Sequence, residues 1–143
     1  MRLFAYLVTD GNGREAAEFY GRVFNVQPHV SLYGDMPADP EFPITDDLKD
    51  KVMHALIPFD EHYALMLSDN FPGAPYTVGN NLSIMYGDEN PEHLKALFSA
   101  LAEGGRIDTP LEATFWTPLY GQLTDKFGFT WQFNCDAPLA DPQ

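Results

Sequence analysis

The chain has 143 residues, the length of one ordinary domain or of two small repeated halves folded together. Hydrophobic residues make up 45% of it and aromatic residues 14%, which is enough for a packed core and excludes a disordered tail. Its formal net charge of -13 argues against nucleic-acid binding as a main role and against an anionic membrane surface, because both partners are bound through basic surfaces.

The cellular compartment is predicted from the cysteine content and the N-terminus. Cys135 is the only cysteine, so no intrachain disulfide can form and the main signature of a secreted domain is missing. The apolar stretch at residues 3–8 is too short for the core of a signal peptide or for a membrane span. We therefore expect a cytoplasmic protein.

A first helix is predicted after a short apolar strand at residues 4–8. Asn12 and Glu15 have the spacing of a capping box, in which two side chains satisfy the free N–H groups at a helix start. The apolar residues that follow recur at the spacing of one helix face: Ala16, Phe19, Tyr20, Val23 and Phe24. This pattern indicates an amphipathic helix that lies on a sheet.

Three strands are expected after this helix, at residues 30–33, 52–59 and 62–68. The last two read as a hairpin that turns about Asp60 and Glu61, which would pair His54 with Leu67. The stretch between the first two strands, residues 34–51, contains three prolines and six acidic residues but no EF-hand spacing. It predicts a solvated flap or a dimer-contact loop.

The second half repeats this order after a linker at residues 71–78. Asn90 is placed as a helix cap with Pro91 at the first helical position, and Gly104 and Gly105 supply the stop. Apolar residues again follow one helix face: Leu94, Leu97, Phe98, Leu101 and Ala102. A hairpin over residues 119–124 and 129–134 turns at residues 125–128, with glycine where a left-handed residue is needed.

The two halves form an internal repeat. A shift of 78, which moves Asp10 onto Asp88 and Asn12 onto Asn90, also aligns the two helices and the strands before them. Each half thus predicts a strand, a helix and three further strands, and such a repeat decides the fold class.

This duplicated module resembles the vicinal oxygen chelate superfamily, which includes glyoxalase I, bleomycin-resistance proteins and extradiol dioxygenases, and most closely its PhnB-like branch. The resemblance covers about residues 1–135. The segments that carry it are NGREAAEFYGRVF at 12–24, VMHA at 52–55, LMLSD at 65–69, GNN at 79–81, LFSALAEGG at 97–105, TFW at 114–116 and TDKFGFTWQFN at 124–134.

The resemblance implies an α+β fold in which duplicated βαβββ modules form a cupped eight-stranded mixed sheet with helices outside and a ligand cleft within the cup. It treats residues 1–143 as a single domain, with module one at about 1–70, a linker at 71–78 and module two at about 79–136. It also implies a homodimer, in which the sheets share edges or exchange modules.

The resemblance also implies where a metal would bind. In metal-using members, His, Glu or Gln residues on the first and last strands of each module hold one divalent ion, which polarises oxygens of the substrate. Here residues 3–6, 64–67 and 81–83 offer none of these types, and only Gln132 on the last strand is of the right kind. Because a catalytic transition metal normally needs three protein ligands, we expect no metal and no cofactor.

The candidate ligand-binding residues come from both halves: His54, Asn81, Trp116, Tyr120 and Trp131. Trp116 is the first choice, since it lies in a loop-like context among aromatic residues. Along the last strand, alternation places Trp131 on one face with Phe129 and Phe133, and Thr130, Gln132 and Asn134 on the other. A face of aromatic rings with a few polar groups is how small apolar ligands are held.

Three functions remain open at this point. The first is a metal-independent protein that binds a small molecule. The second is a lyase, isomerase or dioxygenase with an unusual metal site. The third is sequestration of a cationic drug, as in bleomycin resistance, to which an acidic cleft would contribute. The sequence favours the first of them, and it leaves open the identity of the ligand, whether a reaction is catalysed, and which residues would be catalytic.

Overall fold

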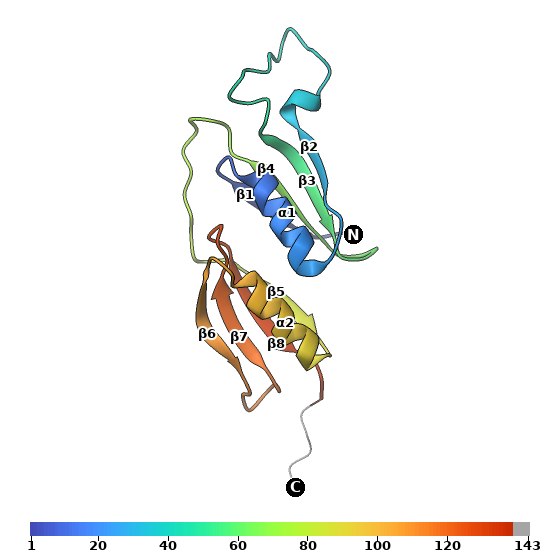
Figure 1. Cartoon of the computed structure of the whole chain (residues 1–143), viewed down its shortest axis with the longest axis vertical. Helices are drawn as coiled ribbons and strands as arrows, with labels where there is room; N and C mark the ends of the chain where they lie inside the picture. The colour runs from blue at the N-terminus through green and yellow to red at the C-terminus, as the bar shows by residue number, and fades with distance from the viewer. Residues whose placement is uncertain (139–143) are drawn as a thin grey trace. The chain divides into compact units, whose positions relative to one another are not determined.

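The structure is a computed structural model that describes residues 1–138 of the chain. It contains two compact units, Met1–Thr77 and Val78–Gln143, shown from blue to green and from yellow to red in Figure 1. Each unit has one four-stranded sheet and one long helix, and each is described on its own below. The reading of residues 1–143 as a single domain stays a prediction.

The first unit follows the predicted order of elements. It consists of β1 (Ala5–Thr9), α1 (Gly13–Phe24), β2 (His29–Leu32), the short 3-10 helix η1 (Tyr33–Asp35), β3 (Val52–Pro58) and β4 (Ala64–Asp69). The strand order in its sheet is β1-β4-β3-β2, with β1 parallel to β4 and the other neighbours antiparallel. Helix α1 covers one face of this sheet, chiefly over β3 and β4 (Figure 1).

The second unit has the same topology. It consists of β5 (Ser83–Asp88), α2 (Pro91–Leu101), β6 (Arg106–Glu112), β7 (Tyr120–Thr124) and β8 (Thr130–Cys135), in the sheet order β5-β8-β7-β6. The predicted α+β class, the duplicated modules and the eight strands in mixed sheets are therefore confirmed. The expectation of one eight-stranded sheet is corrected, because the hydrogen-bonded strands form two sheets of four, and the cup stays a prediction.

The repeat contains a one-residue slip that a constant shift misses. Helix α1 begins at Gly13 and α2 at Pro91, in agreement with the predicted shift of 78. That shift would place buried Leu7 on Met85, which is 55% exposed. Strand pairing gives a different equivalence. Leu7 lies opposite Leu67 in the first sheet, and Tyr86 lies opposite Phe133 in the second, so Leu7 corresponds to Tyr86 with a shift of 79. The turn before α2 is one residue shorter, and a one-residue slip reverses the faces of a strand.

The predicted capping box of α1 is wrong, and a long-range contact takes its place. The Asn12 side chain makes no capping hydrogen bond. The buried Asp69 carboxylate at the end of β4 accepts hydrogen bonds from the backbone N–H groups of Gly11, at 3.0 Å, and Gly13, at 2.8 Å. It also accepts the Thr9 hydroxyl at 2.7 Å and the Val52 N–H at 2.8 Å. One carboxylate thus joins β1, the start of α1, β3 and β4.

Helix α2 begins as predicted. The Asn90 side chain accepts hydrogen bonds from the N–H groups of Glu92, at 3.1 Å, and His93, at 3.2 Å, and Pro91 is the first helical residue. This local cap satisfies donors that have no partner within the helix.

The register of the first hairpin differs from the prediction by one residue. Ala55, not His54, lies opposite Leu67. The Asp60 carboxylate accepts hydrogen bonds from the N–H groups of His62 and Tyr63, and these bonds close a turn with one more residue than predicted. His54 therefore lies on the sheet face away from α1. The predicted register would instead have placed it on the opposite face, beside buried Leu67.

The core of each unit lies between its helix and its sheet. In the first unit the buried side chains include Ala16, Tyr20, Ala55, Ile57 and Leu67, and in the second Leu94, Phe98, Leu123, Trp131 and Phe133. Gly121 is needed where Phe98 crosses β7, because a Cβ atom there would lie 3.0 Å from the Phe98 ring. No helix within residues 1–138 is long and apolar enough to cross a membrane.

Candidate functional site

The candidate site is the face of the second sheet that points away from α2, which we call the open face. Along β8, Trp131, Phe133 and Cys135 are buried and alternate with the half-buried Thr130, Gln132 and Asn134. The sequence pattern predicts this alternation, since neighbouring side chains of a strand point to opposite faces. Strand register places Met85 of β5 and Gln122 of β7 on either side of Gln132.

A chain of hydrogen bonds between neutral side chains crosses the open face. Gln122 Nε2 donates to the Tyr120 hydroxyl at 2.8 Å, and this hydroxyl donates to Gln132 Oε1 at 2.6 Å. Gln132 Nε2 in turn donates to Ser83 Oγ at 2.6 Å. This set, which we call the polar chain, connects β7, β8 and β5 and holds the Gln132 amide from both sides.

Trp116 lies next to the polar chain and is held there by a rigid turn. Its ring is 53% exposed, and its centroid lies 5.6 Å from that of Tyr120. Thr114 Oγ1 accepts the N–H groups of Trp116 and Thr117. Thr117 is buried and donates its hydroxyl to the carbonyl oxygen of Cys135 at 2.7 Å. The turn thereby places a large apolar side chain at the surface.

Trp131 lies on the opposite face and belongs to the core. Its side chain is 2% exposed, and its indole N–H donates to Asp125 Oδ2 at 2.9 Å. The structure thus separates the two tryptophans named from the sequence, and we do not retain Trp131 as a ligand-binding residue.

The open face of the first sheet is more apolar. Tyr6 is 50% exposed and Val8 44%, and Met66 lies opposite Tyr6 in β4. The hydroxyl of Tyr6 lies 3.3 Å from His54 Nδ1, and the two rings are stacked with centroids 5.9 Å apart. His54 thus lies on an open face with Tyr6 as its neighbour, and not on the buried face that the predicted register implied.

Asn81 and the remaining histidines lie elsewhere. Asn81 is exposed and precedes β5, without a hydrogen bond from its side chain among residues 1–138. His62 lies in the β3–β4 turn beside Glu61. His29 is exposed at the start of β2. None of these residues joins the polar chain.

His93 belongs to a cluster at the start of α2. Asp88 Oδ2 accepts the Tyr86 hydroxyl at 3.1 Å and lies 2.5 Å from His93 Nδ1. Burial, together with the hydrogen bond to Asp88, raises the pKa of Tyr86 to about 12. Burial alone would raise the pKa of Asp88, but hydrogen bonds from the Asn90 N–H, His93 and Tyr86 hold it below its usual value. The cluster fixes the turn before α2.

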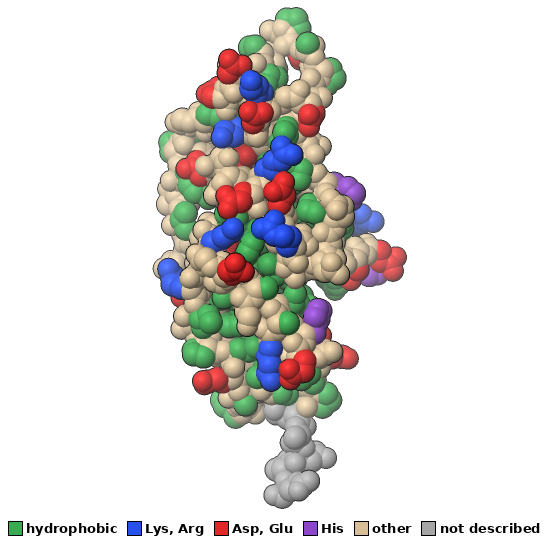
Figure 2. Space-filling view, viewed as in Figure 1, with side chains coloured by type: hydrophobic (Ala, Val, Ile, Leu, Met, Phe, Trp, Pro, Cys, Tyr) green, Lys and Arg blue, Asp and Glu red, His purple; other side chains and the backbone are tan. Residues whose placement is uncertain are grey.

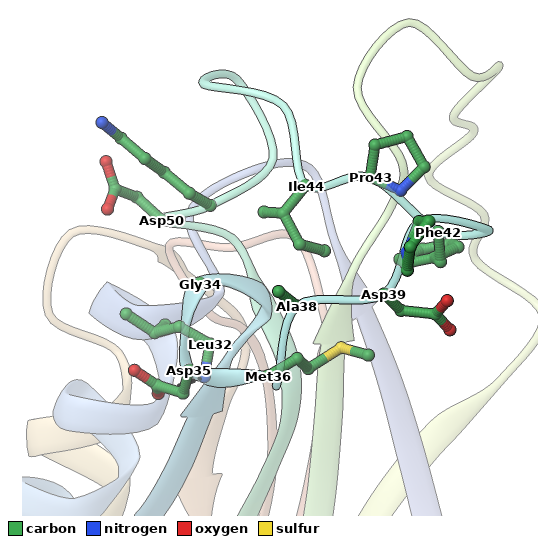
Figure 3. A pocket seen from close by; sticks show the side chains of 12 residues that line it. Leu32, Gly34, Asp35, Met36, Ala38, Asp39, Phe42, Pro43, Ile44 and Asp50 are labelled. Carbon is green, nitrogen blue, oxygen red and sulfur yellow. Dashed lines mark hydrogen bonds between the residues drawn. The ribbon is translucent and has the colours of Figure 1, made fainter.

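A hollow lies within the predicted flap. The loop from Gly34 to Asp50 surrounds a volume of about 790 Å³, lined by the apolar side chains of Leu32, Met36, Phe42 and Ile44 (Figure 3). Asp35 and Asp39 lie at its edge, and their carboxylates accept nearby backbone N–H groups. Acidic and basic side chains are interspersed on the visible surface of this loop (Figure 2). None of the residues predicted for the site lines this hollow.

The side chains present on the open faces do not fit a divalent transition metal. The open-face residues on the first and last strands of the two modules include Tyr6, Met66, Ser83, Met85 and Gln132, which supply no imidazole and no carboxylate. Within residues 1–138 no three His, Cys, Asp or Glu side chains lie close enough together to hold an ion. An amide and hydroxyl groups alone are poor ligands for such metals.

The sequence missed most of the polar chain. Gln132 was considered as a lone metal ligand and as part of the polar face of the last strand, and Ser83 and Gln122 were not selected. Their contacts depend on the register of three strands, since Met85, Gln132 and Gln122 form one row across the sheet. The alternation along β8 was the one signal that pointed toward them.

Comparison with known proteins agrees with the fold. A family model described as the Glyoxalase/Bleomycin resistance protein/Dioxygenase superfamily matches residues 2–133. Protein YjdN of Escherichia coli (strain K12) is 27% identical in an alignment of 146 positions that covers 94% of this chain and 95% of YjdN.

Solved structures give the same result. Protein PA1353 from Pseudomonas aeruginosa is 36% identical, with a TM-score of 0.84 over 96% of this chain and 99% of that one. The PhnB protein from Bacillus cereus is 25% identical, with a TM-score of 0.73 over 94% of this chain and 99% of its own. The resemblance to the PhnB-like branch is thereby confirmed.

Proposed function

Because this chain belongs to the glyoxalase/bleomycin resistance/dioxygenase superfamily, we propose that it binds a small organic molecule on the open face of its second sheet. One observation carries this proposal: Trp116 is held half-exposed by a rigid turn beside the polar chain. Sites for small molecules combine an apolar surface with a few fixed polar groups in this way.

Covering the exposed half of Trp116 would contribute measurably to affinity. An indole ring buries about 200 Å² in full, so covering half of it contributes on the order of 2.5 kcal/mol. The turn fixes the backbone that carries the ring, and the Tyr120 ring lies against it, which reduces the conformational entropy lost on binding. Hydrogen bonds to the polar chain would then set the orientation of the ligand.

The proposal includes no family metal. It is supported by the residues of β1, β4, β5 and β8, the strands that hold the ion in metal-using members, because Gln132 is the only His, Glu or Gln on them. Elemental analysis of the freshly purified protein tests this part. We expect less than one tenth of an equivalent of zinc, nickel, iron or manganese, and a stoichiometric amount would contradict it.

A panel of four bicyclic aromatic compounds tests ligand binding: 2-naphthol, isoquinolin-1(2H)-one, 1-naphthylmethylammonium and 1-naphthoate. We expect at least one uncharged member to raise the melting temperature of the wild-type protein and to lose this effect in Trp116→Ala. Tyr63→Ala is the matched control, since Tyr63 is an aromatic residue of the first unit that is 68% exposed.

Two results would contradict the proposal. A response that survives Trp116→Ala would place the ligand elsewhere. A response to the cation alone would favour the sequestration of cationic compounds that the sequence left open.

A further inference from the structure

The polar chain leaves unused hydrogen-bonding groups at its centre. A primary amide has two N–H donors and an oxygen that accepts two hydrogen bonds. Gln132 uses one donor for Ser83 and one acceptor position for Tyr120, and no other partner is found among residues 1–138. One N–H and one acceptor position therefore remain on an amide that cannot rotate without breaking both bonds.

The apolar part of the site is shaped for a flat ring. Trp116 stands against Tyr120, and Phe115, which is 90% exposed, lies against Trp116 with ring centroids 4.9 Å apart. The two Thr114 bonds and the buried Thr117 fix the turn that carries both rings. Aromatic faces held in this way favour a planar partner, by stacking or by edge contact.

Charge at the site disfavours an anion and offers no dedicated partner for a cation. Strands β5, β7 and β8 contain no lysine or arginine. Of the nearby acids, Asp136 accepts the Asn134 amide, and Asp108 accepts Thr124 and Arg106. Glu112 lies opposite Tyr120 on the edge strand β6 and is exposed to water, which weakens its attraction for a charge. The groups at the centre are uncharged.

We propose that this site is selective for an uncharged, planar ring compound with adjacent N–H and C=O groups, that is, a cyclic amide. Its N–H and C=O pair with the free acceptor and donor of Gln132, while its ring contacts Trp116. Tyr120 acts as a positioning residue, because its hydroxyl holds the Gln132 amide. This inference rests on the proposed function and adds the chemical class of the ligand.

Two matched compounds test it: isoquinolin-1(2H)-one and its N-methyl derivative, which lacks the N–H but keeps the ring. Their dissociation constants are measured by isothermal titration calorimetry with the full chain. The N-methyl compound cannot donate a hydrogen bond to Gln132, and this acceptor would stay unpaired beneath the bound ring. We therefore expect the N-methyl compound to bind about tenfold more weakly. Equal binding of the two compounds would overturn the inference while leaving the proposed function intact.

Two variants connect this ratio to the residues. In Tyr120→Phe and in Gln132→Leu the ratio of the two dissociation constants falls toward one, whereas in Asn134→Leu, an amide loss on the same face outside the polar chain, it stays near ten. A ratio unchanged in Gln132→Leu would overturn the inference, as would binding of 2-naphthol alone. Absence of binding by every compound would overturn the inference and the proposed function together.

Discussion

In the first unit the start of the helix is bonded to a buried carboxylate from a distant strand, whereas in the second unit it is bonded to nearby residues, the asparagine cap Asn90 and Asp88. The Asp69 carboxylate connects four segments of the first unit, while the Asn90 side chain accepts hydrogen bonds from residues two and three positions later. The open faces differ as well, since the first has Tyr6, Val8 and Met66 where the second has a chain of amides and hydroxyls. Both units keep one topology, so strand pairing and the apolar pattern fix the fold while side chains at turns and on open faces diverge.

The largest expected effect is the difference in stability loss between substitutions on the two faces of the second sheet. Trp131→Ala should lower the free energy of unfolding by about 4 kcal/mol, because it removes a buried ring and leaves Asp125 without the indole donor. Trp116→Ala should lower it by less than about 0.5 kcal/mol, since that ring is half-exposed. Urea denaturation measures both. Equal losses would mean that Trp116 supports the fold and is not available for a ligand.

The second effect compares the two helix starts. Asp69→Asn should cost about 3 kcal/mol, because a neutral amide accepts hydrogen bonds more weakly and presents N–H groups to a donor such as Val52. Asn90→Ala, which removes a local cap, should cost about 1 kcal/mol. The same urea titrations measure this pair. A larger loss for Asn90→Ala would contradict the difference between the two units.

The third effect tests the space at the first residue of each helix. A Cβ atom on Gly13 would lie 2.7 Å from Thr9 Oγ1 and 2.9 Å from Asp69 Oδ1, so Gly13→Ala should destabilise the protein by about 2 kcal/mol although alanine favours a helix. Pro91→Ala, the matched change in α2, should cost about 0.5 kcal/mol. Thermal melts compare them, and a stabilised Gly13→Ala protein would contradict the packing described for Asp69.

The smallest effect depends on pH. The pKa of Asp88 is lowered in the folded protein, so its ionised form adds stability above about pH 4, which is lost as the pH falls through the folded pKa. Asp88→Asn should therefore be less stable than wild type at pH 6, by less than about 1 kcal/mol, and the difference should shrink as the pH falls below about 4. Ser99→Ala, which changes no titrating group of α2, is the control. A difference between Asp88→Asn and wild type that is independent of pH would contradict the account of this turn.

Much of the fold could be predicted because its signals are local. The apolar spacing of α1 and α2, the Asn90-Pro91 start and Gly128 in the last turn are each contained in a few neighbouring residues. The contacts of Asp69 with Thr9, Gly11 and Gly13 could not be predicted this way, since they join residues 56 to 60 positions apart. The β3–β4 register failed for a related reason, because the Asp60 side chain sets the length of that turn.

The candidate site could be predicted only in part. Trp116 and Tyr120 lie together as aromatic neighbours in the sequence. The contacts of Gln132 with Tyr120 and Ser83 follow from strand pairing between residues 12 and 49 positions apart. Trp131 was misplaced because alternation shows which residues share a face but not which face the helix covers. The homodimer and the cup stay predictions.

The most direct test of the open face as the ligand site is a two-dimensional ¹H–¹⁵N NMR titration that follows side-chain signals. The titrant is the panel compound that gives the largest thermal shift. The account predicts chemical-shift changes for the amides of Gln122 and Gln132 and the indole of Trp116, with the indole of Trp131 nearly unchanged. Changes confined to the backbone signals of the loop from Gly34 to Asp50, with Gln132 unaffected, would place the ligand in the loop hollow and contradict the account.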